Sequence, residues 1–490
     1  MTNIPESVLD IAASVRTGAC TANDVLQRSL DRIEAAQPTL GAFENVRAQT
    51  AMTMAASIDT AIAKGQNPGP LAGVPIAIKD CIAAEGEPMT CGSRILEGYV
   101  SPFDATVIER LKNAGAVLLG RTRCDEFAMG SSTEHCASGP VANPWSTDHV
   151  PGGSSGGSAA AVSASLVPAS IGTDTGGSIR QPAALCGITG FKPSQGRVPR
   201  YGQVSFAPSM DQIGPFTRTA ADAAAIMEVI AGEDSRDATS GADPLGNIEL
   251  GTNLNGMRIG IAREHCSDDN HPGVNDAVAS AAETAANLGA EIVDVNLTTT
   301  DLGIACYYVI GPAEASSNLA RFDGVRYGQR AANATSLNDM YERSRTDGFG
   351  EEVRRRIMLG TWVLSAGYYD AYYNQALKVR RLIHNEFAQC FASVDLLLGP
   401  TTASPAFKLG EMADPMSMYL CDRYTVTANI AGICGCSIPF GTTQADGVTL
   451  PVGVQLLGPV FGDATVLQCA HAMQTATRHH TSLPPNYSTV

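Results

Sequence analysis

The stretch PGGSSGGSAAA (Pro151–Ala161), followed by GTDTGGSIR (Gly172–Arg180), decides how this 490-residue chain is interpreted. It places two serines, Ser154 and Ser178, in glycine-rich turns. A serine hydroxyl is a poor nucleophile until a base removes its proton. Upstream, the apolar run GVPIAIKD ends in a lysine, Lys79. The combination indicates serine chemistry in which a lysine, relayed through a second serine, supplies the base.

The turn Thr175–Ser178 contains two adjacent glycines, Gly176 and Gly177. Because glycine has no Cβ, successive N–H groups in such a turn can point toward one atom, as an oxyanion hole requires. The same glycines also fit an ordinary tight turn, so by themselves they leave both interpretations open. The sequence also leaves two environments open for Lys79, a buried one and a solvent-exposed one. Burial would favour the neutral form that accepts a proton, whereas a lysine at a strand end can also extend its ammonium group to solvent.

Other catalytic and metal-binding patterns have little support. Gly152–Ser158 lacks the Lys-Ser/Thr ending of a phosphate-binding P-loop, and none of the eight histidines lies within the serine motifs or in an H-E-x-x-H pattern. The thirteen cysteines have no framework spacing, and Cys434-Gly-Cys436 is the only tight pair. We therefore expect reduced, buried thiols, no metal site and no cofactor bound by this chain.

The chain has 33 basic and 49 acidic side chains, a formal net charge of −16. Such a charge disfavours binding to a phosphate backbone, which relies on Lys and Arg contacts. No stretch offers about 18 uninterrupted apolar residues, and Met1–Ala12 has neither a basic start nor an apolar block. We therefore expect a cytoplasmic protein with no membrane association.

From about residue 70, short apolar segments alternate with amphipathic ones. Asp104 and Asp463 each precede an apolar helical face and are expected to cap those helices. This alternation predicts an α/β fold with a large mixed, mostly parallel β-sheet covered by helices on both faces. The expected strands are Gly73–Ile78, Ala116–Leu119, Met257–Ala262, Glu291–Val295, Val394–Leu398 and Val452–Leu457.

One large domain with two short appendages is expected. Residues 1–66 have helical periodicity, with Thr21 and Asp24 resembling a capping box, and would pack on the main domain as an N-terminal helical segment. Residues 67–478 would form the main domain, and residues 479–490 a frayed tail.

GVPIAIKD, PGGSSGGSAAA and DTGGSIRQPA together closely resemble the motifs of the amidase signature family. The resemblance implies that residues 67–478 form an amidase signature domain and that the chain cleaves a carboxamide. It implies further that Ser178 is the acylated nucleophile, Ser154 a bridging serine held by a cis peptide, and Lys79 the base. The implied oxyanion hole consists of the N–H groups of Thr175, Gly176, Gly177 and Ser178.

Four further stretches resemble a narrower family, the A subunits of glutamyl-tRNA(Gln) amidotransferases. In that family a tyrosine, an arginine and an aspartate hold glutamine, and the corresponding residues here are Tyr307, Arg356 and Asp422. Arg355 is the main alternative to Arg356. A guanidinium suits the α-carboxylate of an amino acid, and a carboxylate suits its α-ammonium group. The stretches are DEFAMGSSTE (Asp125–Glu134), PAEASSNLARFDGVRYG (Pro312–Gly328), GFGEEVRRRIMLGT (Gly348–Thr361) and SAGYYDAYY (Ser365–Tyr373).

The narrower resemblance implies a glutaminase subunit that works with B and C subunits. Ammonia would pass to a partner subunit that converts Glu-tRNA(Gln) to Gln-tRNA(Gln) with ATP. ATP and Mg²⁺ would bind to the partner, and tRNA would contact mainly the partner, in keeping with the acidic charge of this chain. The alternative is a stand-alone amidase acting on another carboxamide, since its serine core would be the same.

The sequence departs from the family pattern beside the implied base. Cys81 follows Lys79-Asp80, where the family often has asparagine. It is close enough in sequence to alter the packing beneath the lysine.

Overall fold

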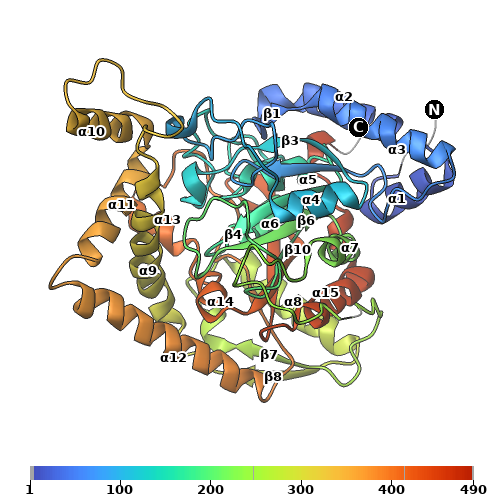
Figure 1. Cartoon of the computed structure of the whole chain (residues 1–490). Helices are drawn as coiled ribbons and strands as arrows, with labels where there is room; N and C mark the ends of the chain where they lie inside the picture. Colours follow the sequence, from blue (N-terminus) through green and yellow to red (C-terminus); the bar gives the residue numbers. More distant parts are fainter. Residues whose placement is uncertain (1–4, 247, 413, 488–490) are drawn as a thin grey trace.

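The computed structural model describes residues 5–246, 248–412 and 414–487 and contains one 11-stranded sheet (Figure 1). The strand order across the sheet is β1-β3-β2-β4-β6-β5-β10-β11-β9-β7-β8. The six expected strands are confirmed, with ends shifted by a few residues. The strands are β1 (Phe43–Val46), β2 (Pro75–Lys79), β3 (Val117–Thr122), β4 (Ala169–Asp174), β5 (Thr189–Lys192), β6 (Gln212–Thr217), β7 (Arg258–Ala262), β8 (Glu291–Val295), β9 (Leu396–Pro400), β10 (Cys434–Ala445) and β11 (Val448–Gly458).

The expected mixed sheet is confirmed, but the expectation that it is mostly parallel is wrong. Only β2 with β3 and β4, and β7 with β8 and β9, pair in parallel, and the other described pairings are antiparallel. β10 and β11 are joined through Asp446-Gly447, and both of these residues have positive φ. A two-residue Asp-Gly loop of this kind makes a hairpin and therefore forces antiparallel pairing. The sequence interpretation also missed β1, at one edge of the sheet, and β4, β5, β6 and β10, which form the antiparallel centre.

Helices cover both faces of the sheet, as expected. Along β11, a Cβ on Gly453 would lie 2.6 Å from Ala184 of α6, and a Cβ on Gly458 would lie 2.6 Å from Val466 of α15. Residues five apart in a strand point to opposite faces, so α6 and α15 lie on opposite sides. The helices are α1 (Val8–Thr17), α2 (Ala22–Leu40), α3 (Ala48–Ala63), α4 (Thr106–Asn113), α5 (Gly156–Ser163), α6 (Arg180–Cys186), α7 (Ala220–Ile230), α8 (Pro272–Asn287), α9 (Gly303–Asn318), α10 (Leu337–Gly348), α11 (Glu351–Val363), α12 (Asn374–Phe391), α13 (Pro415–Leu420), α14 (Val426–Ala431) and α15 (Asp463–Thr477).

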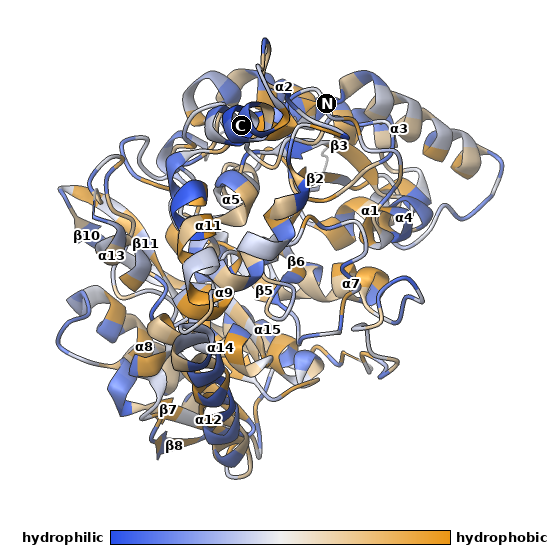
Figure 2. Cartoon of the chain, turned by 60° about the vertical axis from the view of Figure 1, so that its left-hand side comes forward, coloured by the Kyte–Doolittle hydropathy of each residue, from blue (hydrophilic) through white to orange (hydrophobic). Residues whose placement is uncertain are grey.

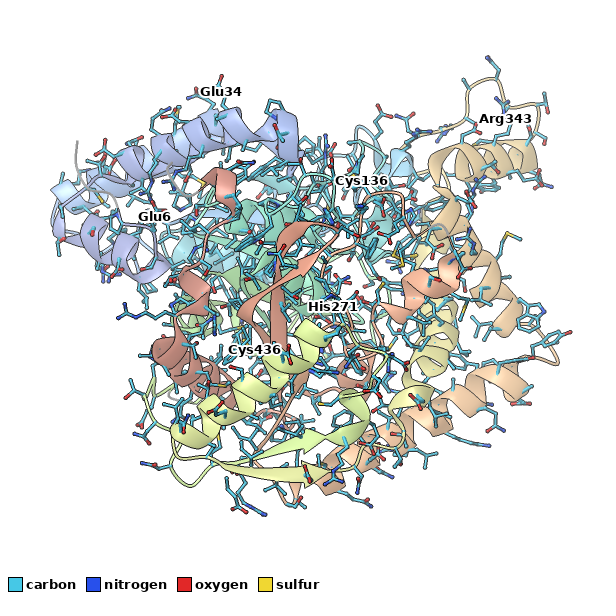
Figure 3. All side chains as sticks on the ribbon, turned by 180° about the vertical axis from the view of Figure 1, so that it is seen from behind. Glu6, Glu34, Cys136, His271, Arg343 and Cys436 are labelled. Atoms are coloured by element: carbon cyan, nitrogen blue, oxygen red, sulfur yellow. The ribbon has the colours of Figure 1, made fainter. Side chains whose placement is uncertain are left out.

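The N-terminal segment is helical apart from one strand. α2 begins with the expected capping box of Thr21 and Asp24, and its exposed Glu34 points away from the body in Figure 3. β1 then pairs antiparallel with β3, so the segment also supplies the edge of the main sheet. At the other end, residues 479–487 contain two short 3-10 turns, and 488–490 lie outside the described residues. The domain boundaries themselves stay a prediction.

The two expected aspartate caps are wrong. α4 begins after Ala105, and Asp104 instead accepts a hydrogen bond from the N–H of Glu85 at 2.7 Å and pairs with Lys112 at 2.7 Å. Asp463 is the first residue of α15 and is fully buried. Asp104 therefore binds Glu85 and the last turn of α4 instead of its first turn, and Asp463 binds Ser194 and Arg197, which are distant in the sequence.

The gold and orange helices α9–α12 form a layer beside the sheet, on the side away from α1–α3 (Figure 1). In Figure 2, α9 is mostly hydrophobic and α12, at the periphery, is mostly hydrophilic. Within the described residues, none of the helices has the length and apolar character needed to span a membrane.

Asp463→Ala should lower the free energy of unfolding by about 3–5 kcal/mol, because it leaves a buried guanidinium without its counter-charge. Asp463 Oδ2 accepts from Arg197 Nε at 3.1 Å, and Oδ1 accepts from the N–H of Ser194 at 2.8 Å. Denaturant unfolding measures the loss. Asp463→Asn, which keeps an acceptor but not the charge, should lose less. A loss of only about 1 kcal/mol from the alanine variant, the typical value for a helix cap, would contradict this account.

Candidate active site

The side chain of Lys79, the last residue of β2, is fully buried among hydroxyl groups. Its Nζ lies 2.7 Å from Ser154 Oγ, 2.9 Å from Ser155 Oγ and 2.8 Å from Thr173 Oγ1. Within the described part of the chain, no carboxylate forms an ion pair with it. The burial of Lys79 and its contact with Ser154 agree with the sequence expectation.

The hydroxyls around Lys79 are not equivalent. Ser155 Oγ donates its proton to the carbonyl oxygen of Thr173 at 3.1 Å, so toward Lys79 it acts as an acceptor. Ser154 Oγ has no other hydrogen-bond partner within the described residues, and its proton is therefore available for transfer. Of the three hydroxyls, that of Ser154 is therefore the one that can exchange a proton with Lys79 without breaking another contact among the described residues.

The expected cis peptide is present between Gly153 and Ser154. The backbone on either side of it is held by hydrogen bonds: the N–H of Gly153 donates to Gln181 Oε1 at 2.9 Å, and the carbonyl of Ser154 accepts from the N–H of Asp125 at 3.1 Å. α5 begins two residues later. Ser154 is thus fixed at the end of a helix that packs against β2 and β4.

The turn that contains Ser178 is organised by the carboxylate of Asp174. Asp174 Oδ1 accepts from the N–H of Gly177 at 2.9 Å, and Oδ2 accepts from the N–H of Ile179 at 3.1 Å. Arg180 donates to both oxygens at 3.2 Å. Burial alone would raise the pKa of Asp174, but the charge and hydrogen bonds of Arg180 outweigh it and hold the pKa below its ordinary value.

Ser178 is 7 % exposed and directly precedes α6. Of the four N–H groups expected in the oxyanion hole, that of Gly177 already donates to Asp174. For the N–H groups of Thr175, Gly176 and Ser178, no hydrogen-bond acceptor is found among the described residues. These three donors are therefore free for a ligand.

Tyr307 of α9 packs directly on the same turn. A Cβ on Gly176 would lie 2.7 Å from Tyr307 Cζ and 2.9 Å from its hydroxyl oxygen, so only glycine permits this approach. Gly177, at φ +137°, meets Thr425 in the same way, with a Cβ placed 2.2 Å from Thr425 Oγ1. The two glycines let side chains from later in the sequence approach the turn.

Arg356 of α11 lies buried in an aromatic box, whereas Arg355 is 41 % exposed. The Arg356 guanidinium lies 5.1 Å from the ring centre of Tyr308, 5.4 Å from that of Tyr419 and 5.7 Å from that of Phe206. Arg355 pairs with the exposed Glu351 and with the second carboxylate oxygen of the buried Glu352. Burial therefore distinguishes the two arginines, which the sequence could not.

Glu352, a residue that the sequence analysis missed, orients Arg356. Its Oε1 accepts from Arg356 Nε at 2.7 Å and from the hydroxyl of Tyr419 at 2.9 Å. No partner is found among the described residues for the terminal nitrogens of Arg356, so they remain available. Because oppositely charged residues four apart on a helix are neighbours, the spacing of Glu352 and Arg356 could have predicted this contact from the sequence.

Asp422, just after α13, is 7 % exposed and incompletely paired. Ser131 Oγ donates to its Oδ2 at 2.5 Å, while its Oδ1 is buried without a partner among the described residues. Burial raises the pKa of Asp422 to about 7, against the lowering by Ser131 and Arg356. The Thr425 hydroxyl lies 3.0 Å from the Asp422 carbonyl oxygen and 2.6 Å from that of Gly176, which links Asp422 to the turn.

Two further features lie beside these residues. Cys81 Sγ lies 3.8 Å from Thr173 Oγ1, so the cysteine contacts a hydroxyl that surrounds the lysine. Beside Arg356, a cavity of about 380 Å³ is lined by Glu134, His135 and Glu351, among others. All thirteen cysteines are free, and the described residues contain no group of three or more His, Cys, Asp or Glu side chains placed to hold a metal ion.

Comparison with known proteins identifies relatives of the whole chain. The family model described as Amidase matches residues 24–467. The A subunit of the glutamyl-tRNA(Gln) amidotransferase of Chromohalobacter salexigens is 51 % identical over 481 residues, covering 98 % of both chains. The protein of the same name from Synechococcus is 52 % identical over 466 residues, covering 94 % of this chain and 96 % of the relative.

Solved structures share the fold. The crystal structure of the A subunit of glutamyl-tRNA(Gln) amidotransferase from Thermotoga maritima has 43 % identity and a TM-score of 0.77, covering 93 % of this chain and 91 % of the other. The native peptide amidase of Stenotrophomonas maltophilia has 29 % identity and a TM-score of 0.82, covering 99 % of each chain.

Asp422→Asn should stabilise the fold at pH 8 but not at pH 4. An aspartate has an ordinary pKa of about 3.9, and here it is about 7. The folded state therefore binds the proton more tightly, and stability is lost as the pH rises from about 4 to 7. Asparagine has no such loss, so the gain at pH 8 has an upper bound of roughly 4 kcal/mol. Unfolding midpoints measured at both pH values test this, and an equal difference at the two would contradict it.

Proposed function

The chain belongs to the amidase family, and within it we propose that it is the glutamine-hydrolysing A subunit of a glutamyl-tRNA(Gln) amidotransferase. One observation carries the proposal: a buried lysine surrounded by hydroxyls lies in the same site as a guanidinium and a carboxylate that each keep unused hydrogen-bonding atoms. The first set suits amide cleavage, and the second suits an amino-acid zwitterion. Glutamine combines both groups in one molecule.

The proposed clamp holds the two charged groups of glutamine. Arg356, oriented by Glu352, would donate its terminal N–H groups to the α-carboxylate. Asp422 Oδ1 would accept from the α-ammonium group, which supplies the partner that this buried oxygen lacks. Tyr307, packed on Gly176, would form the wall between the clamp and the turn of Ser178.

The proposed reaction begins with proton transfer. Ser154 passes its proton to the neutral amine of Lys79 and takes the proton of Ser178, whose Oγ then attacks the side-chain amide carbon of glutamine. The negative oxygen that develops would be stabilised by the N–H groups of Thr175, Gly176 and Ser178, with that of Gly177 shared with Asp174.

Collapse of the tetrahedral intermediate breaks the carbon–nitrogen bond. The proton held by Lys79 returns through Ser154 to the leaving nitrogen, so that ammonia departs and a γ-glutamyl ester remains on Ser178. Water, activated by the same relay, hydrolyses the ester to glutamate and restores Ser178. The side chains involved are buried, which limits competing attack by bulk water.

The proposed complex follows from the name that the relatives share. An A subunit implies partners, and we assign B and C subunits to the complex in the cytoplasm. Ammonia would be consumed on the partner, where ATP and Mg²⁺ activate Glu-tRNA(Gln). The net charge of −16 supports placing most of the tRNA contact on the partner rather than on this chain.

Ser178→Ala should abolish glutamine-dependent formation of Gln-tRNA(Gln) but leave ammonia-dependent formation within about twofold of the wild type. The substitution removes the nucleophile without altering the partner's chemistry. Transamidation by the assembled complex, supplied with glutamine or with ammonium chloride, measures both. Loss of both activities would mean that Ser178 serves assembly rather than catalysis.

Arg356→Ala should raise KM for glutamine by roughly 10–100-fold, the cost of a lost charged hydrogen bond. Arg354→Ala, a matched change at an exposed arginine of the same helix with no ion pair among the described residues, should alter KM less than threefold. Ammonia release at varied glutamine concentration measures both. If Arg356→Ala left the rate unchanged and the chain rapidly hydrolysed simple amides without partners, the stand-alone amidase would be the correct function.

A further inference from the structure

Gln181 bridges two loops of the site without belonging to the set of residues described as reacting or binding. It lies in α6, three residues after Ser178, and is 1 % exposed. Its Oε1 accepts from the N–H of Gly153 at 2.9 Å, and its Nε2 donates to the carbonyl oxygen of Ser131 at 2.8 Å. An amide is the side chain that supplies one acceptor and one donor in this way.

Each loop held by Gln181 leads to one end of the proposed substrate. Ser131 donates through its hydroxyl to Asp422 Oδ2 at 2.5 Å, at the proposed ammonium site. Gly153 precedes Ser154, whose Oγ lies 2.7 Å from Lys79 Nζ. A series of hydrogen bonds, joined by covalent bonds within Ser131 and between Gly153 and Ser154, thus runs from Asp422 to Lys79 through the amide of Gln181.

We propose that Gln181 is a positioning residue that sets the distance between the ammonium anchor and the serine relay, and so selects glutamine over the shorter asparagine. The inference rests on the proposed function, because both ends of the series are defined by a bound amino acid. Asparagine has one methylene fewer, so its amide falls short of Ser178 when its ammonium group is held at Asp422. One missing methylene in a substrate typically changes kcat/KM by about 10–200-fold.

The packing around Gln181 leaves its amide little freedom to shift. A Cβ on Gly152, which has φ +85°, would lie 2.4 Å from Gln181 Oε1. The backbone N–H of Gln181 donates to the carbonyl oxygen of Gly177 at 2.8 Å. The same residue is therefore tied to the turn of Ser178 as well as to the two loops.

The chain offers a matched control in Gln474 of α15. This glutamine is 3 % exposed, accepts from the N–H of Ala220 at 2.7 Å and donates to Thr189 Oγ1 at 2.7 Å. Like Gln181, it accepts one hydrogen bond and donates another, here to a hydroxyl instead of a carbonyl, but none of its partners belongs to the site. Gln474→Met should therefore cost similar stability and leave substrate selection unchanged.

The test compares ammonia release from glutamine and from asparagine by the full chain co-expressed with its partner subunits. Gln181→Met should lower the ratio of kcat/KM for glutamine to that for asparagine by at least about tenfold, through loss with glutamine. Gln474→Met should keep the wild-type ratio. Wild-type chain that releases no ammonia from glutamine would refute the proposed function itself, whereas an unchanged ratio in Gln181→Met would refute only the role of Gln181.

Ser131→Ala provides a second, smaller perturbation that keeps the proposal testable if Gln181→Met does not fold. It removes only the link to Asp422 and should raise KM for glutamine while lowering the same ratio. When both variants fold, their effects should be less than additive in the double variant, because they interrupt one series. Full additivity, or a Ser131→Ala ratio equal to that of the wild type, would overturn the inference.

Discussion

The buried pair of Asp174 and Arg180 is the constraint on which the rest of the site depends. Arg180 also donates to the carbonyl oxygen of Thr425 at 2.8 Å, to Asn429 Oδ1 at 2.7 Å and to Gln455 Oε1 at 3.0 Å. Both charges are fully buried, and a buried charge is tolerated only when all of its partners are in place. The end of β4, the turn of Ser178, α14 and β11 must therefore assemble together.

A second set of buried charges, Arg356 and Asp422, keeps hydrogen-bonding atoms without partners among the described residues. Glu352 compensates Arg356, but Asp422 keeps a buried oxygen without a partner among the described residues and has a pKa raised to about 7 by burial. A buried carboxylate of this kind lowers the free energy of unfolding. Proteins commonly keep such locally unfavourable groups at functional sites. The zwitterion of an amino acid would supply the missing counter-charge.

The two halves of the site come from different parts of the chain. The lysine and serines lie at the ends of β2 and β4 and before α5 and α6, on the sheet that amidases of differing specificity share. The proposed clamp comes from α9, α11 and the segment after α13, all outside that sheet. Because fold does not define function, we assign the choice of substrate to these later side chains.

The serine motifs by themselves predicted the chemistry, because Ser154 and Ser178 lie in glycine-rich stretches that indicate tight turns and Lys79 ends an apolar strand. Strand–helix alternation also determined the α/β class and six of the strands. The sequence could not show that Asp463 would bind Arg197 rather than cap its helix, nor that Gln181 joins Gly153 to Ser131. It could not separate Arg356 from Arg355, since the two are identical in kind and adjacent. Those outcomes depend on which groups are buried and which meet across long sequence separations, and only the tertiary structure decides that.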